Sequence, residues 1–254
     1  MSVTIDEVIG RLQRLLGPLA DAGDPRQYFH ATYLRTTMAV AAEIKRGGFV
    51  DPEWTERWDV AFASFYIDAL EAAIAGGQPS RPWAIAFSAP ADMPALNQVL
   101  FGMNAHINFD LPQALLAVIT DEEFDDPAVT ARREADHRNI DRVLASRVAA
   151  EDDVLIGISG PGSLLNRLLK PLNELGSQRF LREAREKVWA NAVVLSQARR
   201  RGPAAYDRVL AQLSDLSAAK VAALQDTGLV LLKLAVTGFG VRLPTTYRAS
   251  TSHH

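Results

Sequence analysis

Apolar residues recur every three or four positions along most of the chain. The first such stripe occupies residues 5–16, and we expect it to end at Gly17 and Pro18. Because this spacing places apolar side chains on one face of a helix, it predicts a series of helices separated by turns rich in glycine and proline. The other segments with this pattern lie at about residues 25–45, 52–75, 100–118, 128–150, 164–175, 178–200, 204–224 and 229–236.

The same pattern limits the fold class. No segment alternates apolar and polar residues as a strand does, and neither a repeat nor a long linker divides the chain. The sequence therefore predicts an all-α fold: a single helical domain of eight to ten helices, at residues 1–248, around a central buried helix. Residues 249–254 are interpreted as a disordered tail or a cloning remnant, and their two histidines are left out of the candidate site.

The apolar stretch at residues 229–236 is too short to span a membrane. It contains Lys233 and is far below the roughly 20 residues that a bilayer requires. We interpret it as a buried closing helix and expect no transmembrane segment. The chain is expected to be a monomer or a homodimer, and a homodimer would use this stretch because it is the most apolar surface of the C-terminal third.

The composition excludes several classes of protein. With 254 residues, 48% of them hydrophobic, the chain can bury a substantial core. The net charge of −3 gives no broad basic surface, so we expect no nucleic-acid partner, although Arg199, Arg200 and Arg201 form a small cluster. The lack of cysteine excludes disulfides, thiolate zinc sites and cysteine nucleophiles. The N-terminal residues lack a signal-peptide pattern, and we expect a cytoplasmic protein with a small-molecule substrate.

Residues 100–112, LFGMNAHINFDLP, place four polar or ionisable groups in an otherwise apolar helical segment. On a helix His106 and Asp110 share one face, while Asn104 and Asn108 share another. The segment has no evident solvent face, so it is predicted to be buried all round. Buried polar groups need partners, and other segments must supply them. This segment is the leading candidate for a functional site.

A purely structural interpretation of these residues stays open. Asp110 followed by Pro112 and Gln113 fits a capping box, in which Asp110 begins a new helix. The two asparagines could satisfy backbone groups, and His106 could be a hydrogen-bonded core histidine. The acidic residues 120–127 lack the spacing of a calcium loop and are interpreted as a solvated connector.

Polar residues on other predicted helices are candidates to complete the site. We expect His106, Asp110 and Asp59 to approach one another in one polar cavity, lined by Tyr66 and Asn108. The catalytic candidates are His106, Asp110, Asp59 and Tyr66. The candidates for substrate binding are Asn104, Asn108, His30, Tyr33, Asp136 and Arg185. His30 has an alternative role as a satisfied core histidine.

The motif GMNAHINFDLP, preceded by WDVAFASFYIDAL and YFHATYLRTT, resembles a family of actinobacterial proteins of unknown function. The resemblance covers roughly residues 25–150. It implies no particular activity, although it is compatible with a role in specialised metabolism.

The spacing from Gly102 through His106 to Asp110 is also similar to the His-x3-Asp ligand pair of the helical zinc-dependent phospholipase C and P1 nuclease proteins. This chain lacks their N-terminal tryptophan and most of their histidines. The similarity therefore implies at most one or two divalent ions, such as Zn, Fe or Mn. The expected ligands are His106, Asp110, Asp59 and His137, with His30 as the alternative to His137.

Three hypotheses follow. In the first, a metal-dependent enzyme, most simply a hydrolase, uses a bound water as nucleophile. In the second, a metal-free cyclase or tailoring enzyme acts on a small hydrophobic metabolite, with His106 as general acid/base oriented by Asp110. In the third, the protein is a non-catalytic binding or structural protein whose polar core fixes the register of its helices.

Overall fold

The computed structural model describes residues 3–140, 142–143, 183–225, 230, 234 and 237–244. These residues form helices and connecting turns, and no strand occurs among them. The predicted all-α fold with a single helical domain is confirmed. No helix in the described ranges has both the length and the apolar character needed to cross a bilayer. The expectations for residues 164–175 and 249–254 lie outside this part of the chain.

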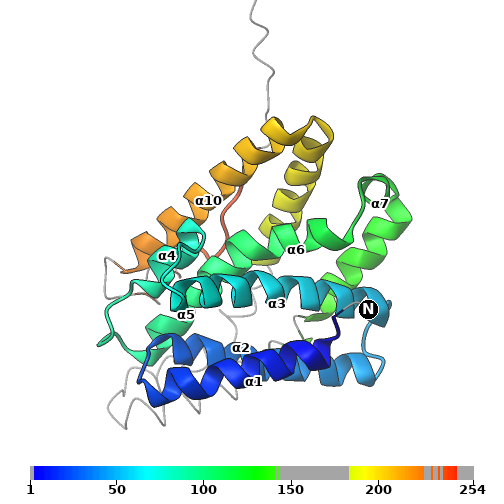
Figure 1. Cartoon of the computed structure of the whole chain (residues 1–254). Helices are drawn as coiled ribbons and strands as arrows, with labels where there is room; N and C mark the ends of the chain where they lie inside the picture. Colours follow the sequence, from blue (N-terminus) through cyan, green and yellow to red (C-terminus); the bar gives the residue numbers. More distant parts are fainter. Residues whose placement is uncertain are drawn as a thin grey trace, which may run out of the picture.

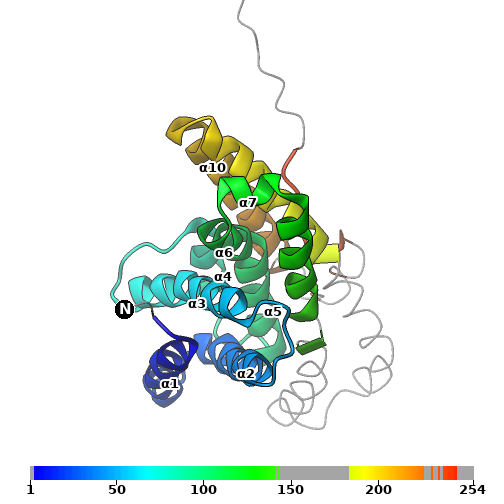
Figure 2. The same ribbon diagram turned by 90° about the vertical axis from the view of Figure 1, so that its right-hand side faces the viewer.

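The first two helices, α1 (Ile5–Asp21) and α2 (Arg26–Lys45), pack side by side, and Figure 2 views both nearly along their axes. Thr4 begins α1 with a capping box, because its hydroxyl accepts from the Glu7 amide while the Glu7 carboxylate accepts from the Thr4 amide. The expected end at Gly17 and Pro18 is wrong: α1 continues for one more turn, which buried Leu19 anchors in the core.

Helix α3 (Pro52–Ile74) begins where the Asp51-Pro52 signal predicts, and the Asp51 side chain accepts from the Trp54 amide. It packs against α1 on one side and α6 on the other. The short α4 (Arg81–Phe87) follows and packs beneath α10 (Pro203–Gln225) (Figure 1).

The central segment is one continuous rod. It consists of α5 (Ala95–Ala105), a π-helical turn η1 (His106–Asp110) and α6 (Leu111–Val118). In the π turn the Leu111 amide bonds to the His106 carbonyl, five residues back. Pro112 has no N–H, and its ring would clash with the Asn108 carbonyl in a regular α-helix, so the wider turn lies where the ring needs room.

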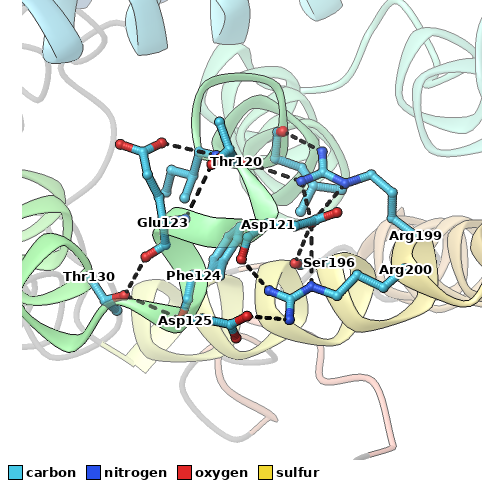
Figure 3. A network of polar contacts seen from close by, with 11 residues as sticks. Thr120, Asp121, Glu123, Phe124, Asp125, Thr130, Ser196, Arg199 and Arg200 are labelled. Atoms are coloured by element: carbon cyan, nitrogen blue, oxygen red, sulfur yellow. Dashed lines mark hydrogen bonds and ion pairs between the residues drawn. The ribbon is translucent and has the colours of Figure 1, made fainter.

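The acidic residues after α6 connect two helices and none of residues 120–127 is buried, as expected of a solvated connector, but they are not an irregular loop. They form the short helix α7 (Asp121–Asp125), which Thr120 begins with a capping box. The Asp121 carboxylate accepts from Ser196 and Arg199, and Arg200 pairs with Asp125 (Figure 3). The arginine cluster therefore serves to dock α7, because Arg199 also donates to two carbonyls at the end of α6.

Two further helical stretches, residues 127–140 and 183–200, complete the described fold together with α10. The main core contains buried residues of α1 to α5, of residues 183–200 and of α10. Val230 and Leu234, the described part of the predicted closing helix, are helical and buried in this core. The rod of α5, η1 and α6 runs through the middle of the molecule, and most of its residues are buried, as predicted for the central helix.

Candidate functional site

The π turn brings His106 and Asp110 into a buried pair. Nδ1 of His106 lies 2.8 Å from Oδ2 of Asp110, and the same oxygen accepts a hydrogen bond from Nε1 of Trp83 at 2.8 Å. His106 is 3% exposed, Asp110 is 1% exposed, and Trp83 is fully buried. Asp110 has helical backbone angles and its side chain caps no helix, so the capping interpretation is wrong. Its carboxylate faces inward instead, where Trp83 and His106 hold it.

The imidazole of His106 lies within a cage of aromatic rings. Phe62 stacks on it with the ring centroids 3.6 Å apart, and Tyr33 approaches at 4.6 Å and nearly at right angles. Three further rings, with centroids 5.8 to 6.0 Å from the imidazole, belong to Phe29, Tyr66 and Trp83. Nε2 of His106 has no hydrogen-bond partner in the described structure. We call His106 and Asp110 the dyad. Asp110 holds Nδ1 of the imidazole, whereas Nε2 makes no hydrogen bond to a described residue and could exchange a proton with a ligand.

Burial determines how this dyad holds its protons. It lowers the pKa of His106 well below its usual value and raises the pKa of Asp110 well above its usual value, against the opposing hydrogen bond from Trp83. Both directions favour a pair without net charge, and such a pair titrates as a unit. In that uncharged pair Nε2 carries a proton and is a donor. Loss of one proton leaves Nε2 as an acceptor, so the dyad suits general acid/base chemistry.

Tyr33 packs against His106, and Asp59 lies near Tyr33; among the described residues no hydrogen bond joins either of them to the dyad. The Asp59 carboxyl is buried, and its Oδ2 has no hydrogen-bond partner. Burial and the nearby charge of Glu56 raise the pKa of Asp59 to about 7. The hydroxyl of Tyr33 makes no hydrogen bond of good geometry among the described residues, although it lies near the side chain of Thr37. Burial, followed by the charge of Asp59, raises its pKa against the opposing effect of Thr37. His106, Asp110 and Asp59 were predicted to approach one another in one cavity. Among the described hydrogen bonds, one joins His106 to Asp110 and none joins Asp59 to either of them.

His30 and Tyr66 form a satisfied structural link. Nε2 of His30 faces the Leu12 carbonyl at 2.8 Å, and since a carbonyl can only accept, Nε2 carries the proton. Nδ1 is then the acceptor for the Tyr66 hydroxyl, also at 2.8 Å. These bonds tie α1, α2 and α3 together. The ring of Tyr66 contacts His106, whereas its hydroxyl and both ring nitrogens of His30 are already hydrogen-bonded within the protein. The catalytic role of Tyr66 and the substrate-binding role of His30 stay predictions, and the structure favours the alternative of a satisfied core histidine.

The two asparagines of the motif are structural as well. Asn104 donates to the Leu100 carbonyl of its own helix, and its side-chain oxygen accepts from Asn108. The carboxamide of Asn108 bonds to the Phe239 carbonyl and to the Val241 amide. Both asparagines thus bond to their own helix and to the C-terminal segment, as the structural interpretation expects, and their substrate-binding role stays a prediction.

The remaining predicted residues lie in a separate region. Asp136 accepts from the Val50 and Asp51 amides and so fixes the loop before α3. Arg185 donates to the carbonyl of His137, whose ring packs between Trp58 and Trp189. This second cluster holds the helical residues 127–140 and 183–200 together, and none of its hydrogen bonds reaches the dyad.

The predicted metal ligands do not converge. Within the described ranges no three His, Cys, Asp or Glu side chains form a group that could hold a metal ion. The expected set of His106, Asp110, Asp59 and His137 is wrong as a ligand group, because His137 belongs to the separate cluster and Asp59 makes no bond to the dyad. The similarity to zinc-dependent phospholipase C and P1 nuclease proteins therefore has no counterpart in this geometry.

Sequence reasoning missed Trp83, Phe62 and Phe29. Trp83 lies in a short segment without evident chemistry, yet a buried indole N–H needs an acceptor, and that need is the signal that points to Asp110. Phe29 packs against Gly102, where an added Cβ would lie 2.4 Å from the ring. The glycine of the GMNAH motif thus lets α2 place an aromatic ring beside the imidazole.

Openings near the dyad are small. A cavity of about 10 Å³, roughly the space of one water molecule, touches Phe29 and Trp83 of the cage. A larger groove of about 470 Å³ lies at the end of α6, away from the dyad, beside Arg57 and Arg199. Of the five rings around His106, only Phe62 is partly exposed. Phe62 is therefore the wall of the cage that faces solvent.

Comparison with known proteins identifies a family but no activity. No curated protein and no solved structure matches the chain. A family model described as "Family of unknown function (DUF5995)" matches residues 5–227, a span that includes the dyad, the cage and Trp83. The chain belongs to this family, DUF5995.

Proposed function

We propose that the protein is a metal-free enzyme in which His106 is the general acid/base for a small, predominantly apolar substrate. One observation carries the proposal: Nδ1 of His106 is held by a buried carboxylate, while Nε2 has no protein partner. A carboxylate that orients an imidazole and leaves its second nitrogen open is the arrangement that proton transfer requires.

Each neighbour has a role in this chemistry. Asp110 fixes the ring orientation of His106 and shares its proton, and Trp83 holds Asp110 in place. The uncharged dyad donates a proton from Nε2, whereas the singly deprotonated dyad accepts one there. The ring of Tyr33 packs against the imidazole, and its hydroxyl, which makes no hydrogen bond of good geometry among the described residues, would bind a polar atom of the substrate.

The cage limits the substrate to small, flat and apolar molecules. Its walls are aromatic, and the unpartnered polar atoms beside it, apart from Nε2 of His106, belong to Tyr33 and Asp59. The substrate would displace Phe62, because that ring stacks on the imidazole and is partly exposed. The chemistry supported best is removal and return of a proton, as in isomerisation or cyclisation, rather than metal-assisted hydrolysis.

A structural role is the second candidate, and the closed packing around His106 favours it. An exchange experiment separates the catalytic from the structural role. A catalytic dyad exchanges protons with a bound substrate, whereas a structural dyad does not. Incubation of the protein in D2O with a panel of small apolar ketones and aldehydes, monitored by NMR, measures exchange of the α-protons. We expect catalysed exchange for part of this panel, and none with His106→Gln.

The matched control is His137→Gln. His137 is also buried and also has an unpartnered Nε2, but among the described residues no hydrogen bond joins its ring to a carboxylate. The control should therefore exchange substrate as the wild type does. If no compound exchanges, or if His106→Gln exchanges as fast as the wild type while folded, the dyad is structural and the proposal fails.

A further inference from the structure

The last described segment, residues 238–244, has no regular secondary structure, turns at Gly238 and Phe239, and lies against two helices. We call it the C-terminal strap; Figure 1 draws it in red beside α10. Nδ2 of Asn108 donates to the Phe239 carbonyl at 3.1 Å, and Oδ1 of Asn108 accepts from the Val241 amide at 3.0 Å. Asn191 repeats the pattern two residues further on, with 3.1 Å to the Val241 carbonyl and 2.8 Å from the Leu243 amide.

On the strap side, all four hydrogen bonds end on main-chain atoms and none on a side chain. A carboxamide offers one donor and one acceptor side by side, as a peptide group in a neighbouring strand does. The bonded residues 239, 241 and 243 alternate, which is the period of one edge of a β-strand. Asn108 on the π turn and Asn191 on residues 183–200 therefore act as a clamp for an extended peptide; we call this pair the asparagine clamp.

Two buried side chains and one glycine also hold the strap against the helices. Phe239 and Leu243 are buried, four positions apart, whereas Arg242 between them is exposed. At Gly240 an added Cβ would lie 2.8 Å from Cδ of Lys187 and 3.0 Å from Cα of Ala184, so glycine allows the strap to approach this helix closely. Lys187 also donates to the Gly240 carbonyl, at 3.2 Å. The site thus fits an extended peptide with two apolar anchors and a glycine between them.

We propose that the asparagine clamp is a peptide-binding site that the protein's own C-terminal strap occupies, and that the strap leaves it as a unit without unfolding the helices. Asn108 lies between His106 and Asp110 on the π turn, so binding of the strap also holds that turn in place. The proposal needs no enzymatic activity, and its tests do not depend on the function proposed for the dyad.

Native-state hydrogen exchange of the full wild-type chain is the first test. The Val241 and Leu243 amides should exchange at least about tenfold more slowly than in a free peptide, yet at least about a hundredfold faster than core amides such as that of Leu213, because a local opening exposes them. Two results overturn the proposal: no protection of the two strap amides, or exchange as slow as that of the core amides, which would tie the strap to global unfolding.

The second test supplies the strap from outside. A full-length Phe239→Ala, Leu243→Ala variant keeps the clamp but weakens the strap, and circular dichroism checks that it is folded. A fluorescein-labelled peptide, TGFGVRLP (residues 237–244), should bind this variant at least about tenfold more tightly than the wild type, where the internal strap competes at high effective concentration. Adding Asn191→Ala to the variant should abolish binding.

Two peptides that each carry one N-methyl group, at neighbouring residues, test whether main-chain hydrogen bonds hold the peptide. N-methylation at Val241 removes the donor to Asn108 and should weaken binding at least about tenfold, whereas N-methylation at Arg242, whose side chain is exposed, should not. Equal effects of the two methyl groups, or equal binding with and without Asn191, would show that the clamp does not hold the peptide. If the double variant does not fold, the hydrogen-exchange result decides.

Discussion

Phe62 lies flat on the imidazole of His106, with the two planes at 4° and the centroids 3.6 Å apart. Since it is the partly exposed ring of the cage, it separates His106 from water. Phe62→Ala should admit water and raise the pKa of His106 toward its ordinary value, because burial is what lowers it. An NMR titration of the ring protons measures it.

The control for this prediction is Phe65→Ala. Phe65 is on the same helix and is also partly buried, but it packs in the second core, with Trp54 and Trp58. Its removal should leave the titration of His106 unchanged. An unchanged pKa in Phe62→Ala would mean that Phe62 does not shield the imidazole.

Trp83→Phe tests the support of Asp110. The variant keeps an aromatic ring but removes the N–H that Asp110 accepts, so the pKa of Asp110 should rise further. Loss of a partner for a buried acceptor should lower the free energy of unfolding by about 1–3 kcal/mol, measured by urea denaturation. Trp189→Phe, a tryptophan of the His137 cluster, should leave the titration of the dyad unchanged. The prediction fails if that titration is the same in Trp83→Phe and the wild type.

Asp59 makes the stability depend on pH. Its pKa is about 7 in the folded protein and near 3.8 in an unfolded chain, so the folded state binds more protons between these values. The contribution is fully present below about pH 4 and is lost as the pH rises to about 7, with an upper size of roughly 4 kcal/mol. Asp59→Asn should flatten the stability profile over this range, measured by urea unfolding at several pH values.

Asp68→Asn serves as the control for Asp59. Asp68 is on the same helix, but it is exposed and lies 3.4 Å from Arg11. This substitution should leave the slope between pH 4 and 7 as it is in the wild type. A wild-type slope in Asp59→Asn would show that this carboxyl ionises in the folded state as it does in water.

Gly102→Ala should destabilise the protein because the new Cβ would lie 2.4 Å from the ring of Phe29. Overpacking of this kind costs about 1–3 kcal/mol, which thermal or urea unfolding can measure. Gly17→Ala is the matched control in helix α1, where a Cβ meets nothing within 4 Å. That change should stabilise by about 0.5–1 kcal/mol, since alanine is a better helix former. Equal effects of the two substitutions would refute the close approach of Phe29.

Helical periodicity predicted the elements well because it depends on neighbours in sequence. The pairing of His106 with Asp110 was predictable for the same reason, since the two residues lie four apart on one helix. The wider π turn was not predictable from periodicity, and it removed the capping role of Asp110. Pro112 is the local feature that could have indicated it.

The partners of the polar groups could not be predicted, because they come from distant segments. The N–H of Trp83 is 27 residues from Asp110, and the main chain that Asn108 binds is more than 130 residues away. His30 and Tyr66 share an environment, yet only the fold shows that they satisfy one another. The sequence indicates which buried polar side chains need a hydrogen-bond partner. Tertiary packing determines which of these side chains keep a polar atom without one.

The π turn also changes the phase of the central rod. One additional residue in a turn rotates everything after it by about 100° relative to a regular α-helix. The part before the turn, α5, packs on α2 and α10, whereas the part after it, α6, packs on α3. The extra residue therefore lets one unbroken helical rod present its apolar stripe to two different layers. Deletion of a single residue from 106–110 would put α6 out of phase with α3 even though every apolar side chain of α6 remained.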